Sequence, residues 1–176
     1  MRFLGLGHRN AGEYKTAEIY RDLRQRVLTL DPTAIGFKPT ETGRIWGFLM
    51  EIGLPKAVAT LVVLADGTVS LYFSNGGGLI GLGQHEVVRK AGLALLAEAP
   101  GFLAYTRSTK EFPLPQKGYT RFYFLTLDGA FTAEAPEEEL GNGRVPLSPL
   151  FFKAHEVITQ ARLVHEKLHG ASTENA

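Results

Sequence analysis

One continuous stretch of the chain, residues 57–96, limits its fold more than any other feature. An apolar and partly β-branched run at 57–64 is followed by Asp66-Gly67 and then by alternating apolar and polar residues at 69–73. The first pattern is typical of a strand covered on both faces, and the alternation is typical of a second strand. Asp-Gly favours a hairpin turn because it tolerates positive φ. We therefore predict two antiparallel strands joined by a tight turn.

A glycine-rich segment, residues 74–83, follows this hairpin and leads into a helix. From about Gln84 onward, apolar residues recur at helical spacing. Pro100-Gly101 is expected to end that helix. Two strands, a glycine segment and an amphipathic helix in succession predict a mixed α and β protein.

Helices are also predicted near both ends of the chain. The first has Thr16 as its N-cap and stops before Asp31-Pro32, and its apolar stripe is Tyr20, Leu23, Val27 and Leu30. Three arginines lie off this stripe and are expected to face solvent: Arg21, Arg24 and Arg26. The last helix begins at Ser148-Pro149, and its stripe is Leu150, Ala154, Val157, Ala161, Val164 and Leu168.

Further strands are predicted at residues 45–52, 102–107, 119–127 and 130–133, because these runs are rich in aromatic and β-branched residues. Asp128-Gly129 is expected to form a second hairpin turn. Trp46 is expected in the core. Residues 136–139 and 141–143 are expected to be loops.

These elements predict a single α+β domain over residues 1–170, with a flexible tail at 171–176. The domain has a mostly antiparallel sheet of about five strands flanked by three helices. Its order of elements is broadly similar to that of profilin-like and roadblock-type modules. Those modules serve binding and assembly more often than catalysis, but a likeness of element order transfers no functional residue.

Composition narrows the classes of partner. The 176 residues carry a formal net charge of +1, so no broad positive field is present to attract nucleic acid or an anionic membrane. The chain has no cysteine, which leaves histidine and carboxylate as the side chains that could hold a transition metal. No apolar run resembles a secretory signal or approaches the roughly 18 residues of a membrane span. We expect a cytoplasmic protein without a cofactor.

The glycine segment is the first candidate site. Glycines can turn backbone N–H groups inward, and a helix N-terminus adds partial positive charge, so a small anion could bind there. The spacing matches neither a phosphate-binding loop nor a dinucleotide fingerprint, and a structural role for the glycines is the alternative. The predicted ligand-binding residues are Asn75, Gly76, Gly77, Gly78, Gly81, Gly83, Gln84 and His85.

A second candidate, residues 117–124, resembles the basic-Gly-aromatic strand of RNA-recognition modules. Arg121 stands where that pattern has an aromatic residue, and Thr120 stands where it has glycine or alanine. We therefore expect these aromatic residues to pack within the sheet rather than stack on bases.

The third candidate is a literal H-E-x-x-H, formed by His165, Glu166 and His169. On a helix this spacing places two imidazoles on one face, with a glutamate that could activate a zinc-bound water. A catalytic zinc ion needs a third protein ligand, and only Glu174 follows. Histidine and lysine in a last helical turn also interact favourably with the helix dipole, which is the alternative interpretation.

The sequence therefore favours a non-catalytic ligand-binding or protein-assembly module that binds a protein partner or a second copy of itself. A small anion at the glycine segment is the ligand we consider. A zinc-dependent hydrolase that uses residues 165–169 is the alternative function.

Overall fold

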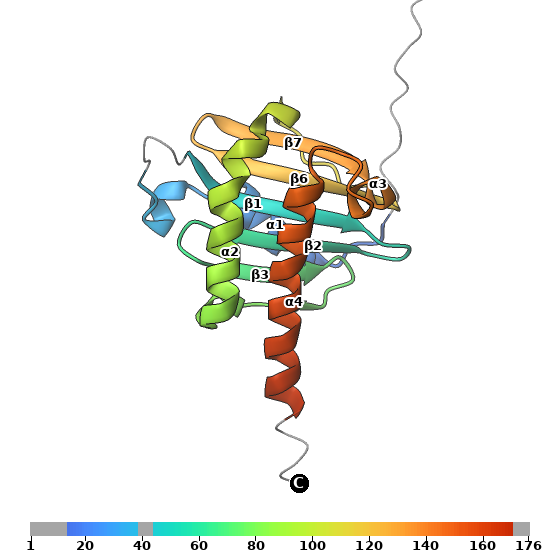
Figure 1. Cartoon of the computed structure of the whole chain (residues 1–176). Helices are drawn as coiled ribbons and strands as arrows, with labels where there is room; N and C mark the ends of the chain where they lie inside the picture. The colour runs from blue at the N-terminus through green and yellow to red at the C-terminus, as the bar shows by residue number, and fades with distance from the viewer. Residues whose placement is uncertain (1–13, 39–43, 171–176) are drawn as a thin grey trace, which may run out of the picture.

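The computed structural model describes residues 14–38 and 44–170, which form one α+β domain (Figure 1). Its antiparallel sheet has seven strands in the order β4-β3-β2-β1-β6-β7-β5. The strands are β1 (Ile45–Gly53), β2 (Val58–Leu64), β3 (Val69–Phe73), β4 (Gly78–Leu79), β5 (Arg107–Thr109), β6 (Tyr119–Thr126) and β7 (Gly129–Pro136). The predicted tail at 171–176 lies outside the described residues.

Helices cover both faces of this sheet. The four α-helices are α1 (Glu18–Leu28), α2 (Glu86–Glu98), α3 (Glu137–Gly141) and α4 (Ser148–Gly170). Figure 1 shows α2 and α4 side by side over one face, with α1 behind the opposite face. The last turns of α4 project beyond the β4 edge of the sheet.

Two apolar layers form the core, one on each side of the sheet. On the side of α2 and α4, Phe48 and Met50 of β1 are fully buried with Phe122 and Phe124 of β6. On the side of α1, Leu49 and Trp46 pack with Tyr20. Every residue of β1 is buried because the strand is central and covered on both faces.

The two Asp-Gly pairs confirm the local turn predictions. Asp66-Gly67 joins β2 to β3, and Gly67 has a φ of 88°. Asp128-Gly129 joins β6 to β7, and Gly129 has a φ of 114°. Glycine adopts these positive φ values without the strain that a Cβ atom would bring.

The count of about five strands was too low, and one predicted strand was wrong. Residues 102–107 are mostly part of a 3-10 helix, Ala99–Tyr105, and only Arg107–Thr109 is a strand. The α-helix α2 ends at Glu98, next to Pro100-Gly101 as predicted, but the chain continues as this 3-10 helix, whose first turn tolerates proline. The structure also contains a strand that the sequence did not predict, β4, which lies inside the glycine segment.

Two predicted boundaries also differ from the structure. The N-cap of α1 is Ala17, not Thr16, and its N–H donates to the Ser74 carbonyl at 2.7 Å. This hydrogen bond links the start of α1 to the residue that follows β3. Residues 137–141, expected to be mostly loop, form α3, whose first turn holds three glutamates that the helix dipole stabilises.

Candidate functional site

The first glycines of the glycine segment build a turn and an edge strand. The N–H of Gly76 donates to the Phe73 carbonyl at 2.9 Å, and the N–H of Phe73 donates to the Gly77 carbonyl at 2.8 Å. Gly78 then pairs with Tyr72 as β4. A Cβ atom on Gly78 would lie 2.8 Å from the Leu71 carbonyl oxygen, so the tight pairing itself favours glycine.

The later glycines pack against the β2–β3 turn. Gly81 has a φ of 74° and precedes a short 3-10 helix, Leu82–Gln84. A Cβ atom on Gly83 would lie 2.1 Å from the Gly67 carbonyl oxygen. This close approach of two backbone segments gives Gly83 a structural role.

Four N–H groups of the predicted anion site already donate hydrogen bonds within the chain: those of Gly76, Gly77, Gln84 and His85. An anion at these donors would have to replace their present acceptors. Gly81, Gly83 and Gln84 also line a cavity of about 390 Å³, whose charged side chains are Asp66 and Arg89. Anion binding at this segment stays a prediction.

Three of the four aromatic residues of the second candidate pack inside the protein, and the fourth, Tyr119, is half-buried. Phe122, Tyr123 and Phe124 are fully buried. The ring centroids of Phe48 and Phe124 lie 5.4 Å apart, edge to face. Arg121 forms an ion pair with Glu134 at 2.7 Å across β6 and β7. These contacts confirm the prediction of packing within the sheet.

The H-E-x-x-H residues lie in the last turns of α4. The ring centroids of His165 and His169 are 4.1 Å apart. Glu166 lies 3.6 Å from the Arg162 guanidinium, and both side chains are exposed. In the part of the chain that the structure describes, no three histidine, aspartate or glutamate side chains are grouped so that they could hold a metal ion. Glu174 lies outside that part.

The structure brings the first and third candidates together. A groove of about 360 Å³ separates the glycine segment from the end of α4. Its walls include Ile80 and His85 on one side and Val164, His165 and Leu168 on the other. Sequence reasoning missed this groove because its walls are about 80 residues apart, and helical or strand periodicity reports only on neighbours along the chain.

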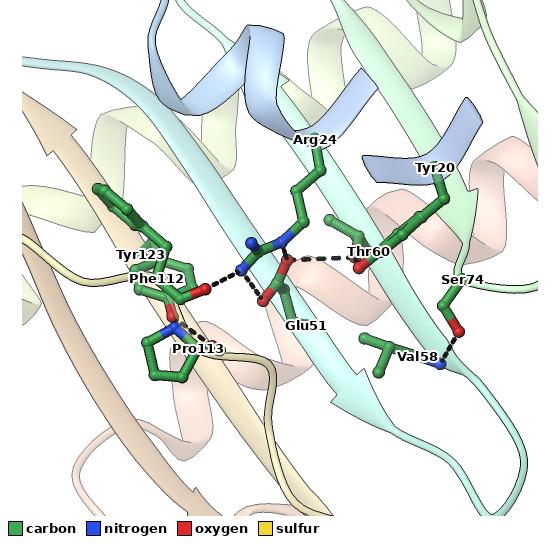
Figure 2. A network of polar contacts seen from close by, with 9 residues as sticks. All are labelled: Tyr20, Arg24, Glu51, Val58, Thr60, Ser74, Phe112, Pro113 and Tyr123. Carbon is green, nitrogen blue, oxygen red and sulfur yellow. Dashed lines mark hydrogen bonds and ion pairs between the residues drawn. The ribbon is translucent and has the colours of Figure 1, made fainter. Parts of the chain in front are cut away.

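A polar network under α1 was also missed (Figure 2). Arg24 was predicted to face solvent, but its side chain is only 12% exposed and forms two hydrogen bonds, at 2.6 and 2.9 Å, with Glu51. Glu51 is fully buried in the central strand. The same guanidinium donates to the Phe112 carbonyl at 2.9 Å. The prediction for Arg24 was wrong because a buried acid on the facing strand provides its partner.

Tyrosine and threonine hydroxyls extend this network. Tyr20 and Thr60 share a hydrogen bond of 2.9 Å, Thr60 donates to Glu51 at 3.3 Å, and Tyr123 donates to the Pro113 carbonyl at 2.6 Å. Burial raises the pKa of Tyr20 and of Tyr123 above the ordinary value for tyrosine, so both hydroxyls stay neutral donors.

The electrostatics around Arg24 keep its guanidinium charged. Burial acts to lower the pKa of Arg24. The adjacent Glu51 carboxylate acts to raise this pKa, and the net change is upward. The network thus links α1 and the 112–113 segment to β1 through charge-assisted hydrogen bonds. Because these polar groups bond to one another, the arrangement is suited to fixing the fold rather than to receiving a substrate.

Comparisons with protein-family models, with curated proteins and with solved structures found no match to this chain. Among the described helices, none combines the length and the apolar character that crossing a membrane requires.

Proposed function

We propose that this protein is a non-catalytic assembly module that binds a second copy of itself through the end of α4. One observation carries the proposal. The apolar stripe of α4 is fully buried at Leu150, Val157 and Ala161, but it continues to Leu168, which is 56% exposed. We call residues 162–170, the C-terminal part of α4, the α4 overhang; Figure 1 shows the last turns of this helix extending beyond the sheet.

Apolar residues from the glycine segment extend this surface. Ile80 is 68% exposed, and it lines the groove across from Val164 and Leu168. Leu163, also on the overhang, is 40% exposed. Exposed apolar side chains gathered around a groove are typical of a protein interaction site, whereas isolated ones are common on any surface.

A second copy is the partner that the overhang fits best. The overhang carries Arg162 and Lys167 on either side of Glu166, so its charges are mixed and can complement those of an identical surface. In a two-fold dimer the overhangs run antiparallel, which opposes their helix dipoles favourably and lets each Leu168 enter the groove of the other copy. The likeness to profilin-like and roadblock-type modules that the sequence predicts is a second, weaker ground for assembly.

Sedimentation equilibrium of the full chain tests this proposal. We expect a concentration-dependent dimer, and we expect Leu168→Glu to shift the protein to monomer because it places a charge in the interface. Phe152→Glu is the matched control, since Phe152 is 49% exposed on the same helix but outside the overhang. A wild-type monomer at high concentration, or equal loss of dimer in the control, would contradict the proposal.

A zinc-dependent hydrolase at His165, Glu166 and His169 is the alternative function. It needs a third protein ligand for the zinc ion, and it needs the Glu166 carboxylate to break its ion pair with Arg162. Stoichiometric zinc in the purified protein, together with peptidase activity that His165→Ala and His169→Ala both abolish, would favour the hydrolase over the assembly module.

A further inference from the structure

We infer that the α4 overhang binds a divalent transition metal ion, zinc being the reference case, between two copies of the chain. The ligands are His165 and His169 of each copy. The inference rests on the proposed self-association and gives it a regulator, since the ion would strengthen the dimer without performing catalysis.

The geometry of the histidine pair is the first support. Residues four apart on a helix lie on the same face, one turn apart. The two rings are already adjacent, with centroids 4.1 Å apart and planes inclined by 70°. In the described part of the chain, no hydrogen bond or ion pair occupies their ring nitrogens, so these nitrogens can coordinate an ion.

The chemistry of the ligands selects the metal class. Neutral imidazole nitrogen suits zinc, copper, nickel and cobalt, whereas magnesium and calcium prefer oxygen ligands. Zinc in a structural site takes four ligands in a tetrahedron. Two imidazoles supply half of that set, and within residues 14–38 and 44–170 no third histidine, aspartate or glutamate joins them.

A second copy can complete the set. His165 and His169 each follow a residue of the apolar stripe, Val164 and Leu168, which the proposed dimer buries. A two-fold axis through antiparallel overhangs places one histidine pair beside the other. Four nitrogens then surround one ion, and the site exists only in the dimer.

His85 offers a competing arrangement within one chain. It lines the same groove as His165 and His169 from the opposite wall. If the groove narrowed, His85 could become a third ligand and the metal would bind without dimerisation. The two arrangements differ in stoichiometry: one ion per two chains for the bridged site, and one ion per chain for the site with His85.

The experiment uses the full chain, freed of metal by a chelator and then titrated with zinc chloride. Calorimetry measures stoichiometry, and sedimentation equilibrium measures association with and without zinc. We expect one zinc ion per two chains and a dimer tightened about ten-fold or more, since binding to one state shifts the equilibrium toward it. The double variant His165→Ala and His169→Ala should lose this effect, and His85→Ala should keep it. Circular dichroism verifies that each variant is folded.

Three results would overturn the inference. They are one zinc ion per chain, loss of zinc binding in His85→Ala, and unchanged association on adding zinc. If the chain dimerises equally well without zinc and in the double variant, the inference fails and the proposed assembly function stands. If the chain stays monomeric with and without zinc, both fail.

Discussion

At the scale of single residues, Glu51 places a charge in the middle of the sheet, where only a well-placed partner can offset the loss of hydration. Arg24 is that partner, at 2.6 Å. The helical periodicity around Tyr20 and Val27 correctly predicted which face of α1 is buried. It could not predict that Arg24, beside that face, is buried too, because this depends on an acid 27 residues away on another element.

Removing the arginine should destabilise the protein strongly. Arg24→Ala leaves the Glu51 carboxylate buried without its cation, which typically costs about 3–5 kcal/mol in the free energy of unfolding. Arg26→Ala is the control, because Arg26 lies on the same helix but is exposed, and such changes stay within about 0.5 kcal/mol. Urea denaturation measures both variants.

A double change separates the burial of charge from packing. Arg24→Met with Glu51→Leu removes both charges, so we expect most of the stability lost in Arg24→Ala to return. If the double variant is as unstable as Arg24→Ala, the network stabilises the fold by shape rather than by charge compensation.

His155 should make stability depend on pH. Burial lowers the pKa of His155 in the folded protein, and within the described residues its buried Nε2 has no hydrogen-bond partner. The unfolded chain, with an ordinary pKa of about 6.5, therefore takes up the proton first as pH falls. The contribution of His155 is present above that pH and is lost below it. Urea midpoints at neutral and acidic pH should differ less in His155→Phe than in the wild type; an unchanged difference would exclude this residue.

At the scale of elements, local chemistry decided what could be predicted. Asp66-Gly67 and Asp128-Gly129 were predictable because a hairpin turn is specified by the residues within it. The segment at 102–107 was not, because Phe102 and Tyr105 suit a strand and the packing of the chain after α2 places them in a 3-10 helix instead. The glycine segment was recognised as special, but its edge strand and its contact with the Gly67 turn depend on the tertiary fold.

That contact predicts a difference between two glycines. Gly83→Ala places a Cβ atom against the Gly67 carbonyl, and forced displacement of tightly packed groups costs about 1–3 kcal/mol. Gly101→Ala meets nothing within 4 Å and should have little effect. Thermal unfolding should show a lower midpoint for Gly83→Ala alone. Equal midpoints would mean that the glycine segment is free to move away from the turn.

At the scale of the whole molecule, the α4 overhang exists because α4 is longer than the width of the sheet on which it packs. The 23 residues of α4 are more than the sheet can cover, so the apolar stripe runs on beyond β4. The sequence correctly predicted the stripe and its members. It could not predict that Leu168, at the end of this stripe, stays exposed while Val164 still packs against the core, because that depends on β4, which the sequence did not predict.

A distance between two copies tests the central claim, self-association through the overhang, most directly. The chain has no cysteine, so Lys167→Cys provides a single site for a spin label on the exposed side of the overhang. We expect dipolar coupling between two labels in the dimer at a distance set by two packed helices, whose axes lie about 8–10 Å apart, plus the reach of the labels. As a control, Ala104→Cys places the label just after the C-terminal end of α2, away from the overhang, and should show no such short distance. Coupling at position 104 but not at position 167 would contradict the account.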